Sequence, residues 1–117
     1  MAIIVGNELN NTLNGSASSD QIYGRGGNDL INGNGATDYL YAGTGNNTVN
    51  GGTGDDRIFS YEGNDVIDGG DGNDLIHVDE LFISIFGGSG IDRLILQTRT
   101  AGTTICPSSG HLAQIAA

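Results

Sequence analysis

A period of nine residues runs through most of this chain. Cut from Gly6, the sequence divides into ten consecutive nine-residue units that reach Ile95 without insertion or deletion. The eighth position of every unit is aliphatic, and its ten residues are Leu13, Ile22, Ile31, Leu40, Val49, Ile58, Ile67, Ile76, Ile85 and Leu94. Unrelated loops would not keep this phase, so we interpret 6–95 as one repeat domain. The segments 1–5 and 96–117 are expected to cap its two ends.

The residue types within a unit predict a turn followed by a short strand. Glycine dominates positions one, two and four, where it permits the positive φ of tight turns. The last three positions place one aliphatic residue between two others, which suits a strand with one inward side chain. Two units then make one coil, with a strand on each side. The predicted fold is all-β, a right-handed parallel β-roll of about five coils with two short-stranded parallel sheets.

The charge balance indicates that the turns need a partner. Fourteen acidic residues against four arginines give a formal net charge of −10, and 21 residues are glycine. Such a chain tends to disorder, and a thin core alone is not expected to offset the ordering of so much glycine. The same charge argues against nucleic acid or an anionic membrane as a partner. A cation that neutralises the acids would compensate.

Other signals are few. Cys106 is the only cysteine, which excludes a disulfide within the chain, and no hydrolase or phosphate-binding motif appears. We therefore predict a non-catalytic module, which could belong to a larger enzyme or toxin. The segment 1–6 lacks the basic and apolar regions of a signal peptide, and no apolar stretch is long enough to span a membrane.

Position six carries half of the acidic residues and divides them by parity. Turns on the same side of a roll come from alternate units, eighteen residues apart. The even units form what we call the even edge, with Asp20, Asp38, Asp56, Asp74 and Asp92. The odd units form the odd edge, with Asn11, Asp29, Asn47, Asp65 and Ile83.

Stacked carboxylates and glycine-turn carbonyls are the oxygen ligands that Ca²⁺ prefers. We expect about four ions along the even edge. The odd edge should bind fewer and more weakly, because Asn offers no charge and Ile83 no oxygen. The alternative is that the column consists of Asx-turn residues that need no metal. Asn would serve that role equally well, yet the even units never use it, and stacked carboxylates without a cation would repel one another.

The repeat resembles the GGxGxDxUx nonapeptide, with U aliphatic, of RTX (hemolysin-type calcium-binding) proteins. The units GGTGDDRIF, GGDGNDLIH and GGSGIDRLI match it at every specified position, and the resemblance covers 6–95. It implies that each ion takes carbonyls from positions two and four of one turn and from positions one and three of the next turn on that edge. The two position-six side chains complete the set.

Carried onto this chain, the resemblance implies four ligand sets on the even edge. The first comprises Gly52, Gly54, Asp56, Gly69, Asp71 and Asp74. The second comprises Gly70, Gly72, Asp74, Gly87, Ser89 and Asp92. The third comprises Asn34, Ala36, Asp38, Gly51, Thr53 and Asp56. The fourth comprises Ser16, Ser18, Asp20, Gly33, Gly35 and Asp38, from units that depart from the glycine pattern.

On the odd edge the expected sites join neighbouring position-six residues. One site joins Asp29 to Asn47 and includes Arg25 and Gly27. The other joins Asn47 to Asp65 and includes Gly43 and Gly45.

Position nine also separates by parity. The odd units carry Asn14, Asn32, Asn50, Asp68 and Phe86, which predicts an asparagine ladder on one sheet. The even units carry Tyr23, Tyr41, Phe59, His77 and Ile95, which predicts an aromatic stripe on the other. The stripe is either cross-strand stacking or a platform for a polysaccharide or a partner chain, and both interpretations stay open.

The repeat weakens near its end. The ninth unit, 78–86, keeps the period but loses the turn glycines, and its run LFISIF is expected to be covered by the C-terminal segment. Residues 94–96 are expected to extend the last strand.

The resemblance implies a calcium-binding module that folds on binding Ca²⁺ in an extracellular bacterial protein exported by type I secretion. The alternative is a calcium-dependent polysaccharide-binding or adhesion accessory module.

Overall fold

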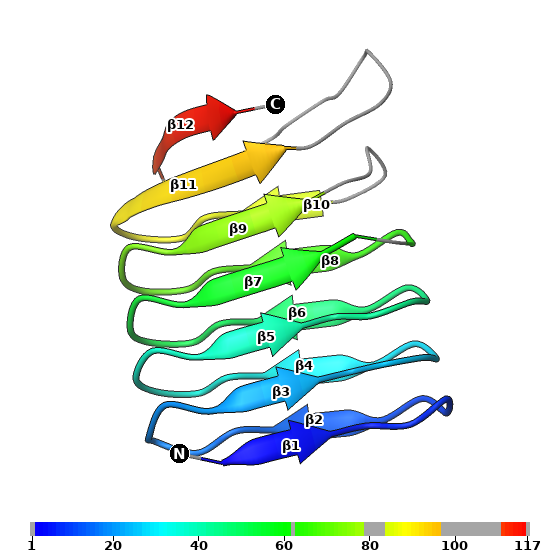
Figure 1. Ribbon diagram of the computed structural model, residues 1–117. Helices are drawn as coiled ribbons and strands as arrows, with labels where there is room; N and C mark the ends of the chain where they lie inside the picture. The colour runs from blue at the N-terminus through cyan, green and yellow to red at the C-terminus, as the bar shows by residue number, and fades with distance from the viewer. Residues whose placement is uncertain (1, 62, 79–83, 97–110, 117) are drawn as a thin grey trace.

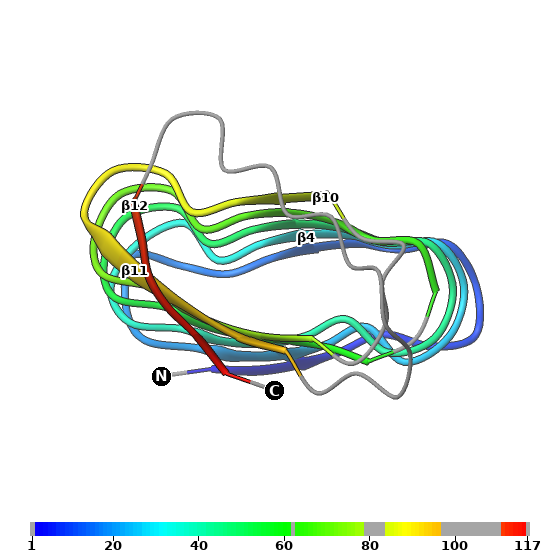
Figure 2. The same cartoon turned by 90° about the horizontal axis from the view of Figure 1, so that it is seen from above.

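The chain forms a flattened rod of stacked coils (Figures 1 and 2). The computed structural model describes residues 2–61, 63–78, 84–96 and 111–116. The described chain has twelve strands, most of them three residues long, in two parallel sheets; the first eleven strands alternate between the sheets, and the twelfth joins the sheet of the eleventh. Within the described residues, no helix is long and apolar enough to cross a membrane.

The even units supply the larger sheet and the odd units the smaller one. In spatial order, the seven-stranded sheet comprises β1 (Ile3–Val5), β3 (Gln21–Tyr23), β5 (Tyr39–Tyr41), β7 (Arg57–Ser60), β9 (Leu75–Val78), β11 (Ile91–Leu96) and β12 (His111–Ala116). The five-stranded sheet comprises β10 (Ser84–Phe86), β8 (Val66–Asp68), β6 (Thr48–Asn50), β4 (Leu30–Asn32) and β2 (Thr12–Asn14). The predicted all-β parallel solenoid, with two units to a coil, is confirmed.

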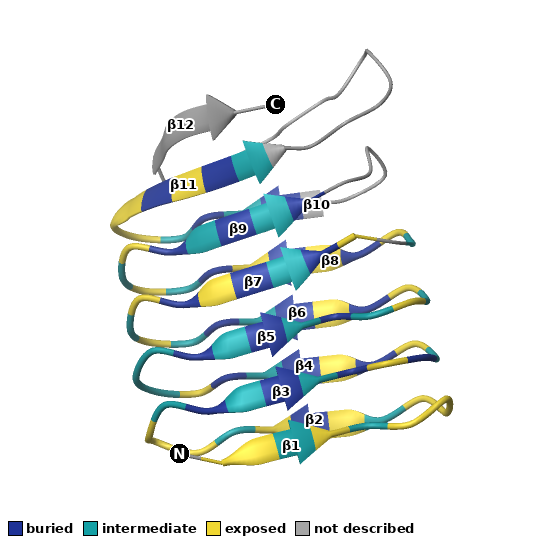
Figure 3. Ribbon diagram, in the orientation of Figure 1, coloured by how far each residue is buried: buried dark blue, intermediate teal, exposed yellow. Residues whose placement is uncertain are grey.

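The register between neighbouring strands is one coil of eighteen residues, so equivalent positions stack directly. Ile22 lies opposite Leu40, and Leu40 lies opposite Ile58. All ten position-eight side chains are buried between the sheets, and Figure 3 shows the buried residue at the centre of successive strands. Ile4 packs against this core from β1, in phase with position eight, so the period begins one strand before Gly6.

The turns bend through left-handed backbone at positions two and four. Most of these residues are glycine, for example Gly52 and Gly54 with φ of 95° and 100°. The non-glycine residues that take positive φ in the described chain are Arg25, Asn34 and Ala36. Ser16 and Ser18 are not among them, so the turn of the second unit differs from the later turns.

Both outward ladders at position nine are present. The Asn32 amide donates to Asn14 Oδ1, and the Asn50 amide donates to Asn32 Oδ1, both at 2.8 Å. On the other sheet, the rings of Tyr23 and Tyr41 stack with centroids 4.6 Å apart and planes within 4°. Phe59 continues this stack at 4.8 Å and His77 at 5.1 Å. Cross-strand stacking is therefore confirmed.

The C-terminal region is described in part. Residues 94–96 lie in β11 as expected, and β12 pairs with β11 in parallel. β10 is the end strand of its own sheet. Residues 79–83, which hold the first half of the LFISIF run, and 97–110, with Cys106, lie outside the described residues. Capping by 1–5 and 96–117 stays a prediction.

The burial pattern predicts that substitutions at position eight destabilise the fold much more than substitutions at position seven. Ile58 is fully buried, so Ile58→Ala should destabilise the calcium-loaded protein by about 2–5 kcal/mol through lost burial and a cavity. Val66 is 44% exposed, so Val66→Ala should change stability by less than about 0.5 kcal/mol. Denaturant unfolding in saturating Ca²⁺ measures both; equal losses would contradict the assigned register.

Candidate metal centre: the stacked turns

The position-six side chains link the coils through one oxygen. Asp38 Oδ1 accepts the backbone N–H of Asp20 at 2.8 Å, and Asp56 Oδ1 accepts that of Asp38 at 2.9 Å. The odd edge repeats the pattern, since Asn47 Oδ1 accepts the Asp29 N–H at 2.8 Å. Asp and Asn both supply this acceptor. Oδ1 of these position-six residues therefore has a structural role that needs no metal.

The second carboxylate oxygen has a different environment. The Oδ2 atoms of Asp29, Asp38, Asp56 and Asp74 are buried and have no hydrogen-bond donor. An ionised carboxylate oxygen removed from water without a donor is costly. Three of these residues are consecutive members of the even edge. A cation beside them would satisfy the unmet acceptors, so these residues fit a Ca²⁺ ion.

Position one has no room for a side chain beside these oxygens. A Cβ added to Gly33 would lie 2.6 Å from Asp38 Oδ2 and 2.5 Å from the carbonyl oxygen of Gly51, closer than non-bonded atoms pack. The carboxylate oxygen and the carbonyl of the next coil therefore converge on one point. This convergence of hard oxygens from two stacked turns is the donor set that Ca²⁺ takes.

Burial raises the pKa values of three even-edge carboxyls, Asp38, Asp56 and Asp74, progressively along the rod. Desolvation, with a smaller contribution from the neighbouring Asp20 carboxylate, raises the pKa of Asp38 to about 6. The pKa of Asp56 rises to about 7 and that of Asp74 to about 8, from desolvation first and then from neighbouring aspartates. Hydrogen bonds from the backbone oppose these shifts and do not reverse them.

Three position-six residues are satisfied from within the chain. Asp20 Oδ2 accepts the Ser16 backbone N–H at 2.6 Å and the Ser16 hydroxyl at 2.8 Å, and these hydrogen bonds lower the pKa of Asp20. The Ser60 hydroxyl donates to Asp65 Oδ2. The Asn47 amide nitrogen donates to the carbonyl oxygen of Ala42 at 3.1 Å.

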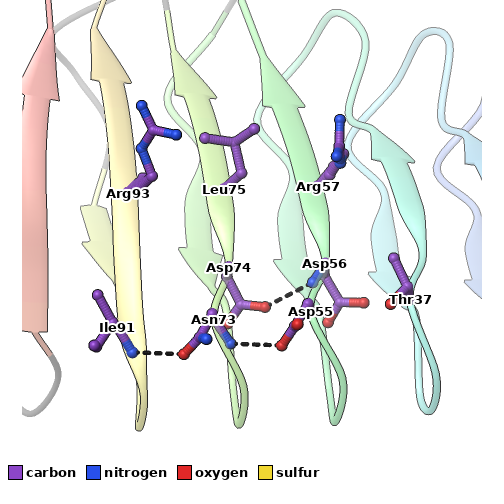
Figure 4. Close-up of a pocket in the computed structure, with 9 residues that line it drawn as sticks. All are labelled: Thr37, Asp55, Asp56, Arg57, Asn73, Asp74, Leu75, Ile91 and Arg93. Carbon is purple, nitrogen blue, oxygen red and sulfur yellow. Dashed lines mark hydrogen bonds between the residues drawn. The ribbon is translucent and has the colours of Figure 1, made fainter.

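The outer faces of the even turns form a cavity that the sequence reasoning missed. It has a volume of about 420 Å³ and is shown in Figure 4. Its lining residues are Thr37, Asp55, Asp56, Arg57, Asn73, Asp74, Leu75, Ile91 and Arg93. Asp55 Oδ1 accepts the Asn73 N–H and Asn73 Oδ1 accepts the Ile91 N–H, both at 2.8 Å, so position five forms a second inter-coil ladder.

The odd edge has the same position-five ladder, built entirely from asparagine. Asn10 Oδ1 accepts from the Asn28 backbone, Asn28 Oδ1 from the Asn46 backbone and Asn46 Oδ1 from the Asn64 backbone, at 2.7–2.9 Å. The recurrence of Asn at this position was the available sequence signal. The ladder binds coils to one another and uses no charge.

The expected even-edge ligands lie together in stacked turns, and no expected pair is split between edges. Ser89 pairs with Asp71 across neighbouring coils, with its hydroxyl 2.8 Å from Asp71 Oδ1. Among the described residues, no group of three or more His, Cys, Asp or Glu side chains gathers at one point. A cation here would depend on backbone carbonyls for most of its ligands.

The raised pKa values predict the pH dependence of the metal-free protein. The folded-state pKa values of Asp38, Asp56 and Asp74 exceed the ordinary value of 3.8, so protonated carboxyls favour the fold. This stabilisation is fully present below about pH 4 and is lost as the pH rises through about 6 to 8. Circular dichroism in chelator should therefore show β-structure increasing as the pH falls from 9 to 5. An acid-induced loss of β-structure over this range would contradict the assignment.

Comparison with known proteins gives one match. A family profile described as RTX calcium-binding nonapeptide repeat (4 copies) matches residues 5–40 and again 41–76, and together these segments cover more than half of the chain. No curated protein and no solved structure matches the chain.

Proposed function

The chain belongs to the family of RTX calcium-binding nonapeptide-repeat proteins, and from that premise we propose that it is a module whose folding is switched on by Ca²⁺ at the even edge. Its repeats form the β-roll and bind Ca²⁺, as the family description states. The finer proposal concerns where the ions bind and what their binding does.

The observation that carries the proposal is the column of buried, unmet Oδ2 atoms at Asp38, Asp56 and Asp74. Without a cation, folding must either bury these charges or protonate the carboxyls. The unfolded chain avoids both costs because its carboxylates are hydrated. Ca²⁺ binds the folded turns and not the dispersed ones, so its binding free energy becomes folding free energy.

The proposed ions lie between neighbouring even turns. The ligand sets centred on Asp56 and Asp74 have left-handed glycines at positions two and four. The gap between Asp38 and Asp56 uses Asn34 and Ala36, which take the same backbone conformation. The gap between Asp20 and Asp38 is the weakest, because Ser16 already satisfies Asp20 Oδ2.

The proposed setting is an extracellular protein exported by type I secretion, as is typical of RTX repeats. Scarce Ca²⁺ inside the cell would leave the carboxylates uncompensated and the chain unfolded for passage. Plentiful Ca²⁺ outside would then drive folding. The net charge of −10 supports this order of events, because self-repulsion opposes collapse before the ions bind.

The switch predicts a calcium-dependent transition that one carboxylate controls. Metal-free protein at pH 8 should lack most β-structure by circular dichroism, and Ca²⁺ should restore it cooperatively. Asp56→Asn keeps the Oδ1 acceptor and removes a buried charge, so the midpoint should move to at least about tenfold higher Ca²⁺. Asp55→Asn removes an equal charge from the outer ladder and should move the midpoint by less than about twofold. Full β-structure in chelator at pH 8 would contradict the proposal.

A second candidate function, calcium-dependent polysaccharide binding, is favoured by one cavity. It has a volume of about 250 Å³ and lies on the aromatic side, lined by Tyr41, Gly43, Thr44, Phe59 and Tyr61. The stacked rings of Tyr41 and Phe59 cover each other's faces, which limits a sugar to their edges. Tyr61 is 42% exposed and tilted 47° from Phe59, so it offers an aromatic face outside the stack.

Binding to immobilised polysaccharides in Ca²⁺ tests this candidate. Tyr61→Ala and Tyr41→Ala should each weaken binding by about tenfold if the cavity holds a sugar. Asn32→Ala, on the opposite sheet, is the control and should leave binding unchanged. Absence of binding to any polysaccharide, or equal losses in all three variants, would remove this candidate.

A further inference from the structure

The two edges differ at position one as well as at position six. Every even unit has glycine there. From the fifth unit onward, the odd units have Ala42, Ser60 and Val78, with exposures of 0%, 0% and 1%. In the even units, a side chain at this position would clash with the position-six Oδ2, as a Cβ added to Gly33 would with Asp38 Oδ2. The buried side chains of the odd units occupy the same side of the turn. The odd edge therefore has side-chain atoms where the even edge has only oxygens.

Asn47 uses the carbonyls that an ion would need. Its amide nitrogen lies 3.1 Å from the carbonyl oxygen of Ala42 and 3.4 Å from that of Thr44. These are positions one and three of its own unit. In the ligand pattern, they are the carbonyls that this turn would contribute to an ion between Asp29 and Asn47. An N–H donor thus points at the oxygens that would face a cation.

Ser60 satisfies the next position-six residue of the odd edge, Asp65. Its hydroxyl donates to Asp65 Oδ2, and both residues are buried. The equivalent oxygens of Asp56 and Asp74 have no such donor. The Asp65 carboxylate therefore has hydrogen bonds at both oxygens, since its Oδ1 accepts the Asn47 N–H at 2.7 Å.

We infer that Ala42, Asn47 and Ser60 prevent Ca²⁺ from binding to the odd edge between Asp29 and Asp65. The Asn47 amide and the Ser60 hydroxyl are neutral hydrogen-bond donors that take the places of the ions. This inference rests on the proposed function, because the even edge defines what an open site looks like. It replaces the expectation of weak sites joining Asp29 to Asn47 and Asn47 to Asp65. Asp29 keeps the one buried Oδ2 on the described odd edge that has no donor.

The two edges are therefore stabilised in different ways. Closed odd turns are held by amide and hydroxyl donors whatever the Ca²⁺ concentration. Even turns depend on the ion. The number of ions bound should therefore follow the even gaps alone and fall short of the number that ten repeats suggest.

The test exchanges the position-one and position-six residue types between the two edges. Ala42→Gly combined with Asn47→Asp gives the fifth unit the Gly and Asp of an even unit. This variant should bind about one ion more than the wild type, counted by native mass spectrometry in saturating Ca²⁺. The mirror variant, Gly51→Ala with Asp56→Asn, gives the sixth unit the closed pattern and should bind about two ions fewer, because Asp56 borders two gaps. Circular dichroism of each loaded variant reports its folding.

Position 60 provides a second measurement that does not require new charge. Ser60→Gly removes both the hydroxyl and the Cβ from beside Asp65 Oδ2 and should add about one ion at that oxygen. Ser60→Ala removes the hydroxyl, keeps the Cβ and should bind the same number as the wild type.

The outcomes separate the two proposals. A wild type that binds Ca²⁺, with no gain in either opened variant, would overturn the closed odd edge alone. A wild-type ion count that already includes odd-edge gaps would do the same. A wild type that binds no Ca²⁺ would remove the proposed function and this inference together.

Discussion

The structure depends on one repeated carboxylate, of which one oxygen is hydrogen-bonded and the other is buried without a donor. At Asp56, Oδ1 accepts a backbone N–H of the preceding coil, which fixes the spacing between turns. Oδ2 is buried beside the same turn and lacks a donor. The hydrogen bond brings the charge into the interior, and the interior then requires a cation. Repetition every eighteen residues turns this local conflict into a column, so that each unmet oxygen lies near the next.

The rest of the fold serves that column. Position eight supplies a core only one side chain thick, which sets the distance between the sheets. Left-handed residues such as Gly52 and Gly54 bend the turns, and glycine at position one keeps a side chain from clashing with Oδ2. Apolar burial in a core this thin does not by itself offset the burial of so many carboxylates. The proposed coupling of folding to Ca²⁺ rests on this geometry of the turn.

Periodicity made most of the architecture predictable from the sequence. A phase kept through ten units fixes register, parity and the inward residue at once, and both position-nine ladders follow from parity. The division between satisfied and unmet oxygens was not predictable, because it depends on local donors. Ser60 and Ala42 break the glycine rule only on the odd edge, and that signal was visible at position one. The position-five ladder was missed because Asn in a turn is ordinary, and only the stacking of coils gives it a partner.

The central claim is that Ca²⁺ neutralises the even column, while Asn47 and Asp65 of the odd column are satisfied by hydrogen bonds within the chain. A crystal structure of the calcium-loaded protein, with an anomalous difference map, tests it most directly. The account predicts peaks beside the Oδ2 atoms of Asp56 and Asp74, each within about 2.3–2.6 Å of carboxylate and carbonyl oxygens. It predicts no peak between Asn47 and Asp65. Peaks in that odd gap, or their absence along the even column, would contradict it.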